Sequence, residues 1–130
     1  MSSTNQHVEA AGIQLDVLAE DGPLVYVRCQ GDMVVPDYGP VGEPLARLLG
    51  QDVYERQVLL DLEKTTFLDT TGVTWLVSCH RNFMNAGGRL ILHSMPPRVR
   101  NVLRLLNLDE VLHTAVDASA AENLAREDTR

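Results

Sequence analysis

Hydrophobic and polar residues alternate in the first third of the chain, a period of two that is typical of strands. The alternation extends from Ile13 to Leu18, stops at Asp21-Gly22-Pro23, and is followed by a β-rich run from Leu24 to Cys29. Two such runs joined by a tight turn predict an antiparallel strand pair. Residues 1–12 are small and polar and have no period, so we expect a flexible N-terminal lead and a fold that starts near Ile13.

Further along the chain, short apolar runs alternate with segments whose apolar residues recur every three or four positions. The runs predict strands and the recurring positions predict helices. Glycine and proline are so frequent from 31 to 44 that this stretch is predicted to be a stiff loop. We expect strands at 57–62, 89–93 and 111–116, and helices at 44–50, from the 69–72 turn to Gly87, at 97–107 and at 118–125.

This order of elements defines the expected fold class. Strands that alternate with helices indicate an α/β domain, with a mixed, mostly parallel sheet of four to five strands flanked by helices. The 130 residues, of which 45% are hydrophobic, suit a single domain of this kind, and we assign it to residues 13–130.

Charge and hydropathy indicate which partners and which location to expect for the protein. The net charge of −7 opposes non-specific attraction to nucleic acids and to anionic membranes. No apolar run approaches the ~20 residues that a membrane-spanning helix needs, and the first residues do not resemble a secretion signal. We therefore expect a cytoplasmic protein without a membrane span. Cys29 and Cys79 lack CxxC spacing, so they are interpreted as reduced packing residues.

The turn at Asp69-Thr70-Thr71-Gly72 is the candidate functional site. The start of a helix exposes backbone N–H groups that favour negative charge, and Asp69 can cap them. Thr70 and Thr71 place hydroxyls there, and the missing side chain of Gly72 would let another molecule approach closely. From the residues alone, two interpretations stay open: an ordinary helix cap, or a site that accepts a phosphoryl group.

A resemblance to a known family favours the second interpretation. Val58-Leu59-Leu60-Asp61-Leu62, followed by Phe67-Leu68-Asp69-Thr70-Thr71-Gly72-Val73, resembles the signature of STAS domains, the family of bacterial anti-sigma factor antagonists and related sensors. Gly87-Gly88 and the spacing of the apolar residues in the helix after Pro97 match the family as well. The resemblance covers about residues 13–116 and implies the STAS fold.

The resemblance also implies a function and a set of site residues. Thr70 corresponds to the phosphorylated residue of the family, with Thr71 as the alternate acceptor. The implied partners are an anti-sigma factor that acts as a serine-protein kinase with its own ATP and Mg²⁺, and a PP2C-type phosphatase. The chain itself would then be a monomer or weak dimer that needs no cofactor or metal and is not an enzyme. The expected partner-binding residues are Asp69, Thr71, Gly72, Thr74 and Trp75.

Trp75 and the preceding loop carry their own expectations. Trp75 is about 200° around the helix from Val73, so it is predicted to be partly exposed and either to anchor a partner or to lie against the neighbouring loop. Many family members have an acidic residue where this chain has Val34, and Asp32 and Asp37 are displaced candidates for it. The proline-rich loop from Pro36 to Pro44 is also unusual for the family.

Two other classes of function compete with a protein that binds an anti-sigma factor and is switched by phosphorylation of Thr70. The alternative is a STAS scaffold in a signalling or transport-associated complex, in which Thr70 is never phosphorylated. An enzyme has little support, because the four histidines have no metal-ligand spacing and no catalytic motif occurs. The arginines at 98, 100 and 104 are interpreted as the solvated face of an amphipathic helix.

Overall fold

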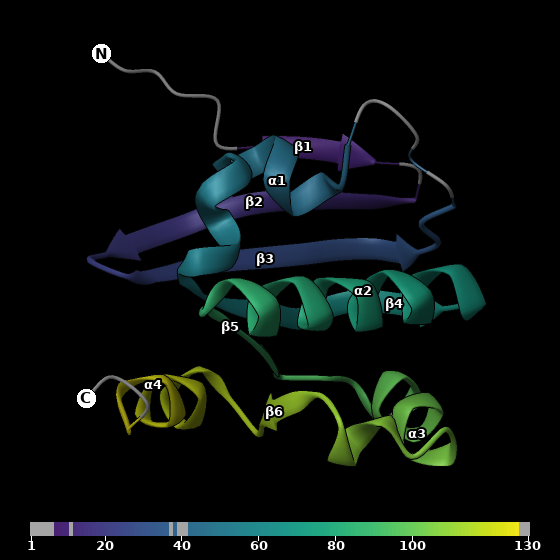
Figure 1. Ribbon diagram of the computed structural model, residues 1–130. Coiled ribbons are helices and arrows are strands. Elements are labelled where there is room, and N and C mark those ends of the chain that lie inside the picture. Colours follow the sequence, from purple (N-terminus) through teal and green to yellow (C-terminus); the bar gives the residue numbers. More distant parts are fainter. Residues whose placement is uncertain (1–6, 11, 37, 39–41, 128–130) are drawn as a thin grey trace.

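The computed structural model describes residues 7–10, 12–36, 38 and 42–127 of the chain and shows one sheet with helices on both faces (Figure 1). The strands are β1 (His7–Ala10), β2 (Ile13–Asp21), β3 (Leu24–Met33), β4 (Gln57–Leu68), β5 (Arg89–His93) and β6 (His113–Ala115). The helices are α1 (Pro44–Leu49), α2 (Thr70–Ala86), α3 (Pro97–Leu105) and α4 (Ala118–Glu127), with short 3₁₀ turns η2 (Gln51–Glu55) and η3 (Leu108–Glu110).

The strands lie side by side in sequence order, from β1 to β6. β1, β2 and β3 pair antiparallel, and β3 to β6 pair parallel. The α/β class and the mixed sheet are therefore confirmed. Within the described residues the sheet has six strands, so the predicted four to five is wrong.

The additional strand is β1, which the sequence had assigned to the flexible lead. His7 pairs with Asp16 and Ala10 with Ile13, so the fold begins before Ile13. This prediction failed because β1 is a short edge strand of only four residues, and an edge strand needs no apolar alternation to pair with its neighbour. The rest of the predicted lead lies mostly outside the described residues.

β4 is longer than predicted and positions the site. The sequence predicted its end at Leu62, but pairing with β3 continues to Met33 opposite Leu68. Beyond Leu62 the strand still buries Thr65 and Leu68, whose spacing of three hides the strand from a search for strict alternation. The extension brings the chain directly to Asp69, the residue before α2.

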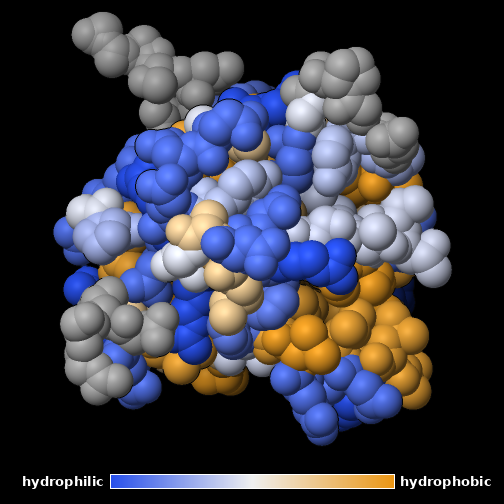
Figure 2. All heavy atoms as spheres, in the orientation of Figure 1, coloured by the Kyte–Doolittle hydropathy of each residue, from blue (hydrophilic) through white to orange (hydrophobic). Residues whose placement is uncertain are grey.

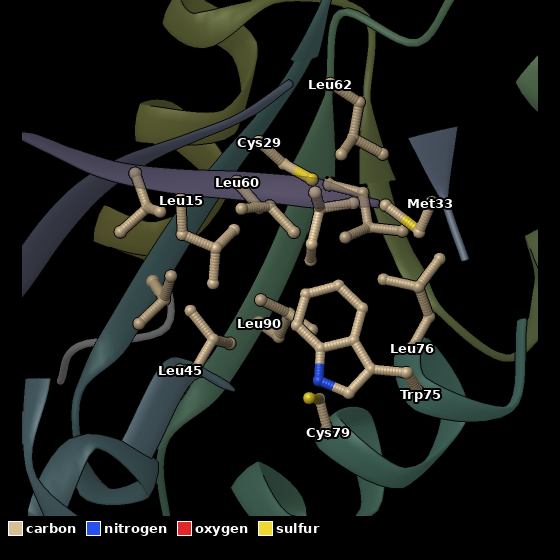
Figure 3. Packing of buried hydrophobic residues seen from close by; sticks show 14 of the residues in the cluster. Leu15, Cys29, Met33, Leu45, Leu60, Leu62, Trp75, Leu76, Cys79 and Leu90 are labelled. Atoms are coloured by element: carbon tan, nitrogen blue, oxygen red, sulfur yellow. The ribbon is translucent and has the colours of Figure 1, made fainter. Parts of the chain in front are cut away.

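Helices α1, α2 and α3 cover one face of the sheet, and α4 covers part of the other. The larger core lies under α1 to α3 and includes side chains from β2 to β5 that are almost fully buried (Figure 3). The smaller core joins α4 to the opposite face of β3, β4 and β5, through Leu24, Leu59, Ile91, Ala121 and Ala125. No helix in the described part of the chain is long and apolar enough to cross a membrane.

Candidate functional site

The site begins with the residue that caps α2. Asp69 has an extended backbone, and its Oδ1 accepts hydrogen bonds from the Gly72 N–H at 3.0 Å and from the Thr71 hydroxyl at 2.6 Å. These two donors, the Thr71 hydroxyl first, lower the pKa of the Asp69 carboxyl. The cap predicted from the sequence is present, and it holds a carboxylate in its ionised form at the start of the helix.

Thr71 connects this cap to the loop after β3. Its hydroxyl donates to Asp69 and accepts a hydrogen bond from the Val35 N–H at 2.9 Å. A hydroxyl has one proton to donate, and here that proton is used inside the protein. Thr71 therefore fixes the distance between the first turn of α2 and the segment that follows Met33.

Thr70 has the opposite environment. It is exposed in the first turn of α2, and within the described residues its hydroxyl makes no hydrogen bond. It borders a groove of about 380 Å³ between α2 and the loop after β3. The groove is lined by Val35, Pro36, Tyr38, Thr70, Thr71, Thr74, Trp75 and Ser78.

The structure corrects the role expected of Gly72. A Cβ at this position would lie 2.1 Å from the Met33 carbonyl oxygen and 2.8 Å from Cδ1 of Leu68. The missing side chain lets α2 approach the protein's own β3 and β4, and Gly72 is buried. The expectation that it leaves room for another molecule is wrong; the glycine instead fixes the height of the first turn above the sheet.

The structure also corrects the expected exposure of Trp75, which is only 2% exposed. Its indole points into the core toward Leu60 and Leu90, with Cys79 next to its nitrogen (Figure 3). The indole N–H donates to Oε2 of Glu43 at 2.7 Å. The expected partial exposure is therefore wrong, and only part of the surface of Trp75 borders the groove next to the loop after β3.

Glu43 is the residue of this region that sequence reasoning missed. It is 7% exposed and caps α1, accepting from the Leu45 N–H at 2.7 Å and the Ala46 N–H at 3.2 Å. The Tyr54 hydroxyl, the Trp75 indole and the Cys79 thiol also donate to its carboxylate. Burial and the nearby Glu43 carboxylate raise the pKa of the Cys79 thiol well above its usual value. A single buried carboxylate thus joins α1, η2 and α2 behind the groove.

The structure describes one of the two acidic residues considered near Val34. Asp32 is exposed, and its Oδ1 accepts from the Thr66 hydroxyl at 2.8 Å, next to the end of β4. Asp37 lies outside the described residues. Val34 donates its N–H to the Asp32 carbonyl at 2.8 Å. Asp69 is therefore the carboxylate that the described structure shows in direct contact with the first turn of α2.

The described residues contain no group of three or more His, Cys, Asp or Glu side chains that could hold a metal ion. The chemistry that the site offers is a free hydroxyl, an ionised cap and a groove bordered by further hydroxyls. Thr70 and Thr74 lie one turn apart on α2, and both face the groove. Of the expected partner-binding residues, Thr74 is exposed, Asp69 and Thr71 are partly exposed, and Gly72 and Trp75 are buried.

The mixed sheet and the capped start of α2 define an α/β domain that presents an exposed threonine at its candidate site. The STAS domain model matches residues 14–122, so the chain belongs to the STAS family.

Solved structures share this fold. An anti-sigma factor antagonist from Mycobacterium paratuberculosis is 19% identical with a TM-score of 0.62, and covers 86% of this chain and 94% of its own. The anti-sigma factor antagonist SpoIIAA in its unphosphorylated form is 21% identical with a TM-score of 0.59. The match covers 91% of this chain and 99% of SpoIIAA. The murine anion transporter Slc26a9 is 15% identical with a TM-score of 0.69, covering 85% of this chain but 19% of the transporter.

Proposed function

We propose that this chain is an anti-sigma factor antagonist that binds a kinase-type anti-sigma factor and is switched by phosphorylation of Thr70. The observation that carries the proposal is the contrast between two neighbouring hydroxyls. Thr70 is exposed and makes no hydrogen bond within the described residues, whereas Thr71 is bound to Asp69 and to the Val35 N–H. A phosphoryl acceptor must reach a donor on another protein, and Thr70 meets this requirement without breaking a contact.

In the proposed reaction the partner supplies ATP and Mg²⁺. The Thr70 hydroxyl oxygen attacks the γ-phosphorus, the bond from that phosphorus to the β–γ bridging oxygen breaks, and ADP leaves. The hydroxyl proton passes to a base of the kinase, and a PP2C-type phosphatase later hydrolyses the phosphothreonine. The antagonist contributes position alone, because Asp69 and Gly72 hold the first turn in one geometry.

Phosphorylation would change the surface that the partner meets. A phosphate adds about −1.5 to −2 charges beside the ionised Asp69 carboxylate. The helix start tolerates the added charge, but a partner that docks around Thr70 loses room and meets like charge from two groups. The unphosphorylated protein therefore binds the anti-sigma factor, and the phosphorylated protein releases it. Among the structural neighbours, SpoIIAA has been solved in both forms.

The test is phosphorylation by a kinase-type anti-sigma factor, followed by mass spectrometry. We expect phosphate on Thr70 in the wild type and none after Thr70→Ala. Ser119→Ala is the matched control, because Ser119 is an exposed hydroxyl residue in the first turn of α4, on the opposite face of the sheet, and it should leave the phosphorylation intact. Phosphate on Thr71, or none at all, contradicts the proposal. Thr70→Asp should also reduce recovery of the anti-sigma factor in a pull-down.

A second candidate function is a STAS scaffold within a transport-associated complex, where Thr70 stays unmodified. The similarity to a part of Slc26a9 is the observation that favours it. The same pull-down separates the two functions. A scaffold recovers its partner equally from wild type, Thr70→Ala and Thr70→Asp, whereas a switch loses it with Thr70→Asp.

A further inference from the structure

A second groove runs along the other side of the α2 ridge that borders the Thr70 site. It lies between α2 and the end of α3 and is lined by Val73, Thr74, Val77, Ser78, Arg81, Leu106 and Leu108. Thr74 and Ser78 border both grooves, so the two are continuous across one ridge of the helix. We call this second groove the α2–α3 groove.

The α2–α3 groove is apolar although it is open to solvent. The lining residue Leu106 is 51% exposed and its neighbour Leu105 is 82% exposed, and the lining residues Val73 and Val77 are partly exposed. Figure 2 shows a continuous hydrophobic area at the lower right of the molecule, on the side where Figure 1 shows α2 and α3. A contiguous exposed apolar area on a chain with a closed core is characteristic of an interaction surface.

The two helices that form this groove carry charges of one sign, and the nearest carboxylates in the sequence are Asp109 and Glu110, which follow Leu108. Residues 70–108, which include all of α2 and α3, contain five arginines and no aspartate or glutamate, although the whole chain carries a net charge of −7. Arg81, Arg98 and Arg104 are exposed, and no carboxylate pairs with them within the described residues. An acidic protein has carboxylates in excess for its own arginines, so a cationic surface without partners is available to an external acidic group.

On both helices an arginine lies on the same side as apolar residues, at a spacing of four residues. On α2, Val73, Val77 and Arg81 follow at intervals of four and line the groove together. On α3, Arg98 precedes the partly buried Val102 by one turn, and Leu106 follows by another, so these three also share one side. The α2 wall of the groove therefore ends in a positive charge, and Arg98 lies at the other end of α3 from the lining residue Leu106.

We propose that the α2–α3 groove binds an acidic amphipathic helix of the partner protein, next to the hydroxyl that the partner phosphorylates. The apolar face of that helix packs on Val77 and Leu106, and its carboxylates pair with Arg81 and Arg98. The wall from Val73 to Arg81 is about 12 Å long, which matches roughly two turns of a docked helix. The inference rests on the proposed function only in that the partner is a protein that approaches the start of α2.

The arginines of α3, which the sequence predicts to be a solvated face, lie beside exposed apolar residues in the structure. A solvated face lies opposite the apolar stripe, whereas Arg98 and Arg81 lie at the ends of exposed apolar stretches. Opposite charge around an apolar anchor accelerates docking and fixes its orientation, at the expense of sensitivity to salt.

The test selects helices from a displayed library against the full chain. The library fixes leucine along one face of a 16-residue helix and leaves glutamate, lysine or glutamine free at the other positions. We expect the selected helices to be rich in glutamate and poor in lysine. Their affinity should fall about tenfold when salt rises from about 50 mM to about 300 mM. Selection of lysine-rich or uncharged helices overturns the proposal.

Variants of the chain locate the binding. The double variant Arg81→Glu/Arg98→Glu should bind the selected helices at least about tenfold more weakly than the wild type. Leu106→Glu, at a half-exposed position that leaves the core intact, should do the same. Arg47→Glu is the matched control, because Arg47 is an exposed arginine on α1 without a carboxylate partner in the described structure. This variant should bind the selected helices with an affinity within about twofold of the wild type. Equal loss with Arg47→Glu, or no loss with the double variant, overturns the assignment.

Two further arms address other occupants and the link to phosphorylation. Binding to anionic phospholipid vesicles that Arg81→Glu/Arg98→Glu abolishes, or concentration-dependent self-association that Leu106→Glu abolishes, would replace the helix by a membrane or a second copy. Thr70→Ala should bind the selected helices like the wild type. If the helices bind but Thr70 is never phosphorylated, the proposed function fails and this inference stands. If Thr70 is phosphorylated equally well in the double variant, this inference fails and the proposed function stands.

Discussion

The two faces of the sheet differ in what covers them. One face is closed by α1, α2 and α3 over a continuous apolar core. The other is covered by α4 over β3, β4 and β5, and beyond α4 a row of polar residues crosses the strands. His7, Asp16, Arg28, Asp61 and His93 are successive partners in this row.

The difference shows where the fold can hold a site rigidly. On the polar face, His7 Nδ1 lies 2.9 Å from Asp16 Oδ1 and the Arg28 guanidinium 3.7 Å from the Asp61 carboxylate, at side chains that water partly reaches. Such pairs contribute little net stability. On the apolar face the Glu43 carboxylate is buried and accepts hydrogen bonds from five donors. Changes on the apolar face should therefore cost much more.

Glu43→Ala should show the largest cost on the apolar face. The change leaves the donors of Trp75, Tyr54 and Cys79 without their shared acceptor in a buried setting and removes the cap of α1. We expect a loss of about 4 kcal/mol in the free energy of unfolding, measured by urea denaturation. The emission of Trp75, the chain's one tryptophan, should also shift. Glu55→Ala, at an exposed glutamate in η2, is the control and should change neither signal.

Gly72→Ala should have the next largest effect on the free energy of unfolding. The added Cβ would meet the Met33 carbonyl oxygen at 2.1 Å and force α2 away from the sheet. We expect a loss of about 3 kcal/mol, together with slower phosphorylation of Thr70, because the first turn moves. Gly87→Asn is the matched control at the other end of α2. Its φ of 93° is positive but the surrounding space is open, and Asn tolerates that conformation. If both variants lose the same stability, close packing does not explain Gly72.

The sequence could predict only part of this site. Asp69, Thr70 and the start of α2 follow from capping rules and a local motif. Trp75 was misplaced because a helical-wheel argument assumed that α2 is buried on the sheet side alone, whereas α1 and η2 cover a second side. Glu43 gave no signal, because glutamate is not a favoured cap and three of its donors lie 11 to 36 residues away in the chain.

The polar row itself should respond to pH, with the smallest effect of the three. Burial lowers the pKa of His93 from its usual 6.5, although Asp61 and Asp117 oppose this shift. In the unfolded chain His93 binds a proton near that usual value, while in the folded protein it stays neutral. Stability should therefore fall as the pH drops through about 6.5 and should stop falling below the folded-state pKa.

The two ends of the row have opposite signs, which supplies the control. The pKa of His7 is raised, chiefly by its hydrogen bond to Asp16, so His7 contributes stability below its unfolded pKa that is lost as the pH rises. Between about pH 7.5 and about pH 5.5, His93→Asn should reduce the acid-induced fall in melting temperature, and His7→Asn should enlarge it. Identical pH profiles for both variants would mean that the two histidines do not sense different environments, and the contrast between the buried and the open end of this face would be lost.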